Sequence, residues 1–323
     1  MYNKFAKYTQ IYLAYKLKKT TLHHLPVQIS IEPTNICNFK CSFCNQSNPN
    51  HFKARQAGSI KIDDYEHILN RIKNECKDIK IISLTLDGEP VLHKDLAEMI
   101  KKTNQKGFFV RFSSNGSKID HNFLERTKDL SYLISIDFSL DKDGFEKHRG
   151  NNGSWYLVDN NLKEIINYFN INKGLHLEIF ENSAYYTGLN TALSNLKLMK
   201  EHYGKMPRLT YGLRRYHKII NGDTQTFPNN KYYGCFYPWT SLTITWNGDV
   251  VTCCRDLDGK YILGNIFQSS IRDIWNGQKY LHLREAILKQ NLQSIPSCRS
   301  CDLPYDNQRN RWDYVIQKIF RKW

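Results

Sequence analysis

A regular alternation of short apolar runs with amphipathic helical patterns is the feature that most constrains this fold. From residue 27 to about residue 218, runs that predict strands alternate with segments whose apolar residues recur at helical spacing. Such alternation builds right-handed βαβ units around a parallel sheet. The predicted strands span residues 27–33, 80–90, 108–116, 133–140, 175–180 and 208–216.

The pattern changes after residue 218, which predicts a second, smaller domain. Residues 241–254 read as two short strands around an Asn-Gly turn, a strong hairpin signal. Helices are predicted over residues 270–290 and, with a basic amphipathic pattern, over residues 311–322. We therefore expect an amphipathic helical extension over residues 1–26, a strand–helix domain over residues 27–218 and a small domain over residues 219–323.

Composition and charge limit the class of protein. Hydrophobic residues make up 41% of the chain and aromatic residues 13%, which is enough for a sizeable core. No apolar run is long enough for a transmembrane helix, and the lysine-rich N-terminus lacks a secretory signal, so we expect a cytoplasmic protein. The net charge of +15 favours an anionic partner, or serves solubility alone. No nucleic-acid reader motif is present, so nucleic acid is not expected.

The nine cysteines are clustered, and their odd number argues against a disulfide framework. Cys37, Cys41 and Cys44 form a CxxxCxxC pattern directly after the first predicted strand. Three thiolates on one loop can hold one face of a cluster of soft metal ions, and they leave one iron of a four-iron cube open. A zinc site is the alternative, but it needs a fourth ligand close by, and the nearest histidine is His51.

This loop resembles the cluster motif of the radical S-adenosylmethionine (SAM) enzymes, and the resemblance extends over residues 27 to about 218. The other matching positions, in chain order, are Phe43, Gly88-Glu89-Pro90, Ser114-Asn115-Gly116, Ser139, Asp141 and Arg149. They fall at the ends of successive predicted strands, where parallel α/β folds bind ligands. The alternative is that these residues only form loops.

The resemblance implies a fold, cofactors and roles. The fold is a partial (β/α)6 barrel, and Cys37, Cys41 and Cys44 hold a [4Fe–4S] cluster whose open iron binds SAM. Phe43 lies near the adenine, Glu89 and its neighbours meet the methionine amino group, and the region from Ser139 to Arg149 meets the ribose and carboxylate. Reductive cleavage of SAM then gives a 5′-deoxyadenosyl radical that abstracts a substrate hydrogen.

Four later cysteines, Cys235, Cys253, Cys298 and Cys301, resemble the twitch domain, a shortened form of the SPASM domain, because no cysteine follows Cys301. The resemblance implies one auxiliary [4Fe–4S] cluster with these four ligands, in a domain made of a β-hairpin and a helix. The spacing particularly resembles that of the butirosin-pathway aminocyclitol dehydrogenase. A zinc knuckle at the last two cysteines is the alternative.

Cys254, next to Cys253, has three interpretations. It is a small buried apolar residue, or it replaces Cys253 as a ligand, or it is a catalytic hydrogen-atom donor, as a thiol is in some peptide epimerases of this superfamily.

The expected function is oxidation of a sugar, aminocyclitol or nucleotide-sugar substrate, with electrons from a reducing partner such as flavodoxin or ferredoxin. Modification or epimerisation of a ribosomally made peptide is the alternative, and a non-catalytic zinc or Fe–S module is a remote one. The two terminal helices are expected to pack on the rest of the protein. Because basic residues flank their apolar faces, peripheral membrane contact is the alternative.

Overall fold

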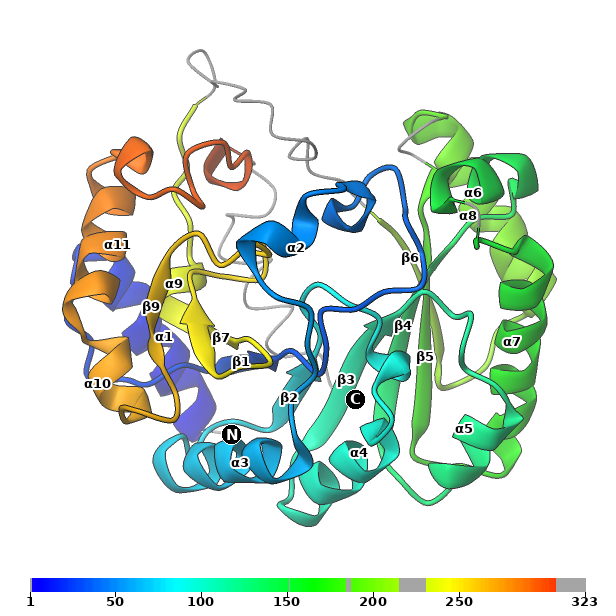
Figure 1. Ribbon diagram of the computed structural model, residues 1–323, viewed down its shortest axis with the longest axis horizontal. Helices are drawn as coiled ribbons and strands as arrows, with labels where there is room; N and C mark the ends of the chain where they lie inside the picture. The colour runs from blue at the N-terminus through cyan, green and yellow to red at the C-terminus, as the bar shows by residue number, and fades with distance from the viewer. Residues whose placement is uncertain (1, 151, 184–186, 215–230, 306–323) are drawn as a thin grey trace. The chain divides into compact units, whose positions relative to one another are not determined.

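The computed structural model describes residues 2–150, 152–183, 187–214 and 231–305 (Figure 1). The predicted helix over residues 311–322 lies outside the described residues. The chain divides into two compact units. The barrel unit comprises Ser30–Asn70 and Lys80–Tyr216, and the auxiliary unit comprises Met1–Ile29, Arg71–Ile79 and His217–Trp323. None of the described helices combines the length and the apolar character needed to cross a membrane.

The barrel unit is built on six strands in the order β6-β5-β4-β3-β2-β1, with parallel pairing from β2 to β6. The six predicted strands are confirmed, and all but β5 are shorter than predicted, because their ends leave the sheet as loops. The strands are β1 (Gln28–Ile31), β2 (Ile81–Leu84), β3 (Phe109–Ser114), β4 (Tyr132–Phe138), β5 (Leu175–Glu181) and β6 (Leu209–Leu213).

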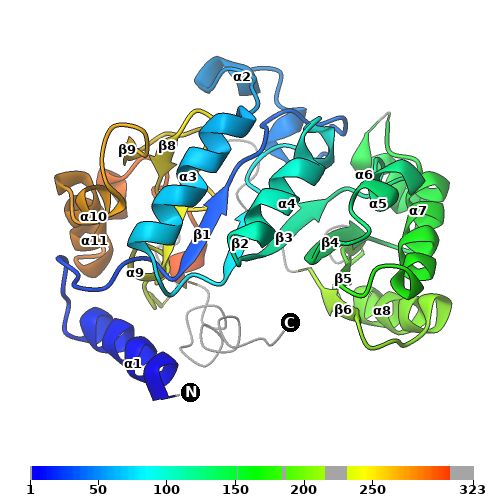
Figure 2. The same cartoon turned by 90° about the horizontal axis from the view of Figure 1, so that it is seen from below.

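Helices follow most of these strands, as the alternation predicts, and Figure 2 shows α5, α7 and α8 together on one side of the sheet. Phe138 of β4 packs against Phe145 and Trp155 of two helices, with ring centroids 5.1 and 5.5 Å apart. The helices are α2 (His51–Ala54), α3 (Ile62–Glu75), α4 (Leu96–Gln105), α5 (His121–Arg126), α6 (Lys142–Arg149), α7 (Trp155–Asn167) and α8 (Leu189–Tyr203). The sequence did not predict α6, because its residues are mostly charged.

The auxiliary unit contains the predicted hairpin. Strands β7 (Ser241–Ile244) and β8 (Asp249–Val251) pair antiparallel around Gly248, whose φ of 85° suits the turn. A third strand, β9 (Ile262–Asn265), pairs with β8 and was not predicted, because Gly264 and Asn265 weaken its pattern. The helices are α1 (Tyr2–Lys16), α9 (Tyr237–Thr240), α10 (Ile271–Trp275) and α11 (Gln278–Leu288).

The prediction of a single helix over residues 270–290 is wrong in one respect, because the segment is broken into α10 and α11. Gly277 stands between them, and a Cβ there would lie only 2.9 Å from the Asp273 carbonyl oxygen. Ser270 caps α10 by accepting a hydrogen bond from the backbone N–H of Asp273. The cap and the glycine therefore define two short helices in place of one.

The N-terminal segment packs within the auxiliary unit. Ile11 is fully buried, and the Tyr15 ring lies 4.2 Å from the Phe236 ring and 5.0 Å from the Trp239 ring. The indole N–H of Trp239 donates to the Lys19 carbonyl at 3.0 Å. The predicted packing of the first terminal helix is therefore confirmed at these residues.

Candidate active site

The loop after β1 carries three cysteines and is held in shape by hydrogen bonds. Asn35 fixes its start, since its side-chain oxygen accepts from the backbone N–H of Gly58 at 2.8 Å. The backbone N–H of Cys44 donates to the Cys41 carbonyl at 2.9 Å, so the second and third cysteines share one turn. Cys41 is buried, and Cys37 and Cys44 are half-buried.

The three thiols are wholly or partly buried, and a buried thiolate needs a compensating partner. Burial raises the pKa of Cys37 to about 12 and that of Cys44 to about 11. Two side chains already donate to the sulfurs: Asn115 Nδ2 to Cys37 at 3.8 Å and Arg149 Nη1 to Cys41 at 3.6 Å. In the described residues, no three His, Cys, Asp or Glu side chains gather closely enough to hold one metal ion. The donors fit sulfurs whose protons have been displaced by an iron–sulfur cluster.

The segment after β2 lies directly against this loop. A Cβ on Gly88 would come within 2.4 Å of the Thr34 carbonyl oxygen, so glycine is required for the close approach. The buried Glu89 carboxylate accepts from the backbone N–H groups of Val91 at 3.1 Å and Asn115 at 2.6 Å. Burial nevertheless raises the pKa of Glu89 to about 7. A buried carboxyl of this kind is suited to a cation such as an ammonium group.

Pro90 opens the short 3-10 turn Pro90–Leu92 after Glu89, and the turn after β3 lies beside this segment. There the Ser114 hydroxyl accepts from the backbone N–H of Gly116 at 3.0 Å. Asn115 Nδ2 also donates to the Asn38 side chain at 2.9 Å. Asn115 therefore connects the turn after β3 to both the cysteine loop and Glu89.

Ser139 and Asp141, after β4, have local roles in the structure. The Ser139 hydroxyl accepts from the backbone N–H of Asp141 at 3.1 Å. The Asp141 carboxylate in turn caps α6 by accepting from the backbone N–H of Gly144 at 3.1 Å. These contacts account for the serine–aspartate spacing, and direct contact of either residue with a cofactor stays a prediction.

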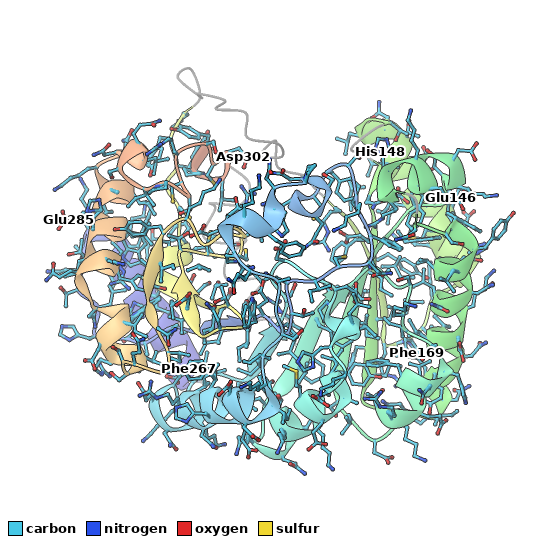
Figure 3. All side chains as sticks on the ribbon, viewed as in Figure 1. Glu146, His148, Phe169, Phe267, Glu285 and Asp302 are labelled. Carbon is cyan, nitrogen blue, oxygen red and sulfur yellow. The ribbon has the colours of Figure 1, made fainter. Side chains whose placement is uncertain are left out.

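Helix α6 is tied to the cysteine loop at its C-terminal end, where Figure 3 labels His148. The His148 ring nitrogen lies 2.8 Å from the Ser42 hydroxyl. The Arg149 guanidinium lies 5.4 Å from the Phe43 ring centre and 5.0 Å from the Phe145 ring centre. The predicted residues Phe43 and Arg149 are therefore neighbours, in a cation–π contact beside Cys41.

A buried charged network beside this site was missed by sequence reasoning. Arg55 forms a bidentate ion pair with Glu32, with Nη1–Oε2 and Nη2–Oε1 distances of 2.8 and 2.7 Å. Its Nη2 also lies 3.6 Å from Asp87 Oδ2. His51 Nε2 lies 2.6 Å from Asp87, so the residue considered as a zinc ligand pairs with a carboxylate. The available signal was that Glu32 and Asp87 follow adjacent strands, whose ends converge.

The sheet face opposite the helices is polar. Phe138 faces the helices, so the alternate residues of β4 point the other way. Side chains on this face form hydrogen-bonded pairs between strands. The pairs are Arg111 with Ser83 at 2.6 Å, Ser135 with Glu178 at 2.9 Å and Arg214 with Asp137 at 2.8 Å. Such a face suits a polar substrate with hydroxyl or charged groups.

The auxiliary unit gathers the four later cysteines from three segments. Burial raises the pKa of Cys235 to about 12 and raises that of Cys253, Cys298 and Cys301 above the ordinary range. For each of them, another cysteine of the set or the Arg255 guanidinium is a further influence. The structure therefore brings the four predicted ligands into one electrostatic neighbourhood.

Cys254 differs from Cys253. The sulfur of Cys253 accepts from the Arg255 backbone N–H at 3.4 Å and is influenced by Cys235, Cys298 and Cys301. Cys254 is exposed, so its interpretation as a small buried residue is wrong. Cys254 also influences Cys253 and Cys235 electrostatically, so the assignment of Cys253 as the ligand in place of Cys254 stays a prediction.

Two family models match the chain. Residues 31–177 match the radical SAM superfamily, and residues 235–302 match SPASM, an iron–sulfur cluster-binding domain. The first match spans the cysteine loop, Glu89 and the α6 region, and the second spans all four auxiliary cysteines.

Curated relatives are distant. The chain is 22% identical to the tungsten-containing aldehyde ferredoxin oxidoreductase cofactor-modifying protein of Pyrococcus furiosus, over 88% of each chain. It is 27% identical to an S-adenosyl-L-methionine-dependent 2-deoxy-scyllo-inosamine dehydrogenase of Niallia circulans, over 25% of this chain and 33% of that protein. The names of these two relatives describe different reactions.

Solved structures share the fold. BtrN in complex with AdoMet and 2-DOIA matches with a TM-score of 0.55 and 17% identity, over 86% of this chain and 93% of that chain. SuiB of Streptococcus suis, bound to the precursor peptide SuiA, matches with a TM-score of 0.62 and 19% identity, over 90% of this chain and 77% of that one. The expected fold, a radical SAM barrel followed by a smaller domain, is therefore confirmed.

Proposed function

We propose a reaction for this chain from the premise that it is a radical SAM enzyme with a SPASM domain, and that it uses [4Fe–4S] clusters and SAM. The reaction is oxidation of a carbon bearing a hydroxyl group, in a substrate of the sugar, aminocyclitol or nucleotide-sugar type. The proposal is supported by the mutual electrostatic influence of Cys235, Cys253, Cys298 and Cys301, and by Arg255, which donates to both Cys253 and Cys301. Four thiolates complete the coordination of a cluster, which suits electron transfer better than substrate binding.

Different residues of the chain would hold the cluster and SAM. Cys37, Cys41 and Cys44 would hold the cluster with the open iron, and Glu89 would accept hydrogen bonds from the methionine amino group. Asn115 and Arg149 would donate to the ligating sulfurs of Cys37 and Cys41, as they donate to these thiols here. When bound, SAM and its cluster supply a radical that abstracts one hydrogen atom from the substrate.

The oxidation removes a hydrogen atom, a proton and an electron from the substrate, and each needs an acceptor. The substrate carbon would lose a hydrogen atom, its hydroxyl would lose a proton, and the remaining electron would be accepted by the cluster that Cys235, Cys253, Cys298 and Cys301 would hold. We assign the proton to Glu178, a carboxylate on the polar sheet face and 2.9 Å from the Ser135 hydroxyl. An external reductant such as flavodoxin or ferredoxin would supply the electron that starts the cycle.

Two observations support a polar, anionic substrate. The sheet face opposite the helices presents Arg111 and Arg214 among hydroxyl and carboxylate groups. The net charge of +15 agrees with a phosphate-bearing molecule. The partial similarity to a 2-deoxy-scyllo-inosamine dehydrogenase supports oxidation of a hydroxyl-bearing ring.

A peptide substrate is the second candidate, favoured by the structural similarity to SuiB with its bound precursor peptide. Epimerisation of a peptide needs a donor that returns a hydrogen atom to the product radical. Cys254 is exposed and could serve, and its replacement by Ala distinguishes the two candidates. Oxidation of a small molecule would survive this change, whereas epimerisation would not.

The test is anaerobic incubation of the cluster-loaded protein with SAM, a reductant and panels of aminocyclitols, nucleotide sugars and peptides. Mass spectrometry of the products in deuterated water gives the answer. Loss of two hydrogen atoms from a hydroxyl-bearing small molecule supports the proposal. Deuterium incorporation into a peptide without net oxidation refutes it in favour of epimerisation.

A further inference from the structure

Arg255 lies against the auxiliary cysteines in a way that the sequence did not indicate. Its backbone N–H donates to Cys253 Sγ at 3.4 Å, and its Nη1 donates to Cys301 Sγ, also at 3.4 Å. The same Nη1 donates to the carboxylate of Asp302, which Figure 3 labels. One arginine thus contacts two of the four sulfurs of this set and one acid.

The guanidinium is largely removed from water. Its side chain is 15% exposed, and Nη2 is buried without a hydrogen-bond partner among the described residues. A guanidinium is not deprotonated in proteins, so Arg255 places a positive charge beside the sulfurs.

One acid lies in contact with this arginine. Asp302 accepts a hydrogen bond from Arg255 Nη1, the same nitrogen that donates to Cys301 Sγ. The carboxylate therefore partly neutralises a positive charge that is in contact with a cysteine sulfur.

We propose that Arg255 raises the reduction potential of the auxiliary cluster, through its positive charge and its N–H donors to the sulfurs. Net charge and hydrogen bonds to sulfur are the two main controls of such potentials. Reduction adds one negative charge to the cluster, and a buried cation in contact stabilises that charge more than the oxidised form. The electron from the substrate radical is then accepted more readily, a consequence that rests on the proposed oxidation.

Two substitutions change the charge in opposite directions, and a third is a matched control. Arg255→Gln removes the cation, and Asp302→Asn removes the acid that partly neutralises it. Arg299→Gln changes an arginine that stands between Cys298 and Cys301 in the sequence. Its exposed guanidinium instead donates to the Gln293 carbonyl, at 3.3 and 3.1 Å.

The measurement is an EPR-monitored redox titration of the full-length, cluster-loaded protein. The auxiliary signal is identified as the one that SAM does not alter. A hydrogen bond to a charged group changes an equilibrium by about tenfold or more. We therefore expect Arg255→Gln to lower the ratio of reduced to oxidised auxiliary cluster about tenfold at a fixed potential, which corresponds to a downward shift of about 59 mV. Asp302→Asn should raise the ratio, and Arg299→Gln should leave it unchanged.

The direction in which each variant shifts the ratio of reduced to oxidised auxiliary cluster decides the outcome. Shifts in the same direction for Arg255→Gln and Asp302→Asn, or no difference between Arg255→Gln and Arg299→Gln, would overturn the proposal. If Arg255→Gln loads no auxiliary iron, Arg255→Lys and Asp302→Asn still test it, because Arg255→Lys keeps the charge and should lower the ratio less than tenfold. Opposite shifts with unchanged product yield would support the role of Arg255 and refute electron acceptance by this cluster.

Discussion

Replacing Glu89 by Gln should change two measurable quantities in opposite ways. The substitution keeps the shape of the side chain and removes its ionisation. SAM affinity should fall by roughly ten- to over a hundredfold, because a charge-assisted contact to the amino group is lost. The stability of the SAM-free variant relative to the SAM-free wild-type protein should instead rise with pH.

The magnitude follows from the pKa. Burial raises the pKa of Glu89 from 4.5 to about 7, so the folded protein favours the protonated carboxyl. The stability that this preference contributes is fully present below pH 4.5 and is lost as the pH rises through 7. The loss amounts to about 3 kcal/mol, since each pKa unit corresponds to about 1.4 kcal/mol. A glutamine side chain cannot ionise, so the Glu89→Gln variant escapes this loss.

The assay is urea unfolding of the SAM-free wild-type protein and the Glu89→Gln variant between about pH 4 and about pH 8. The difference in unfolding free energy should move by about 3 kcal/mol in favour of the variant over this range. Glu285→Gln, on the exposed face of α11 beside Lys289, is the control and should show no such drift. A pH-independent difference, or SAM affinity equal to that of the wild-type protein, would refute the burial argument and the assigned role.

Three further changes test other parts of the structure. Loaded protein should hold about eight irons, and replacing Cys37, Cys41 and Cys44 together by Ala should leave about four and abolish SAM cleavage; retained cleavage would contradict the assignment. Cys298→Ala with Cys301→Ala should keep some 5′-deoxyadenosine formation but give no oxidised product, and normal product formation would exclude electron acceptance by the auxiliary cluster. Arg55→Ala should lower the unfolding free energy by about 3–5 kcal/mol, because it removes the guanidinium that pairs with the buried Glu32 carboxylate. The exposed Arg126→Ala serves as its control, and an equal effect would contradict the reasoning.

The architecture could be predicted because strand and helix patterns repeat at the right spacing. The cysteine loop, Glu89 and Asn115 stood out because each follows a strand, where parallel sheets gather their functional residues. Gly248 was identifiable within its turn because a tight hairpin needs a positive φ. These features are local, so a short window of sequence contains them.

Other features depend on partners far apart in the chain. Arg55 pairs with Glu32, and His51 pairs with Asp87, and no short pattern marks either pair. Arg255 resembles many surface arginines until the fold places Cys301 and Asp302 beside it. The predicted cofactor role of Asp141 competes with helix capping, a role that its sequence position fits equally well.

The packing of the N-terminal segment on residues 236–284 has a consequence for biosynthesis. Lys19 and Trp239 are hydrogen-bonded although 220 residues separate them. The carbonyl of Thr20 accepts from the buried Arg284, which is further still along the chain. A ribosome adds roughly 5–20 residues per second, so the first helix waits on the order of tens of seconds for its partners. During that interval its apolar side chains are open to chaperones, and the barrel unit can fold before the auxiliary unit closes.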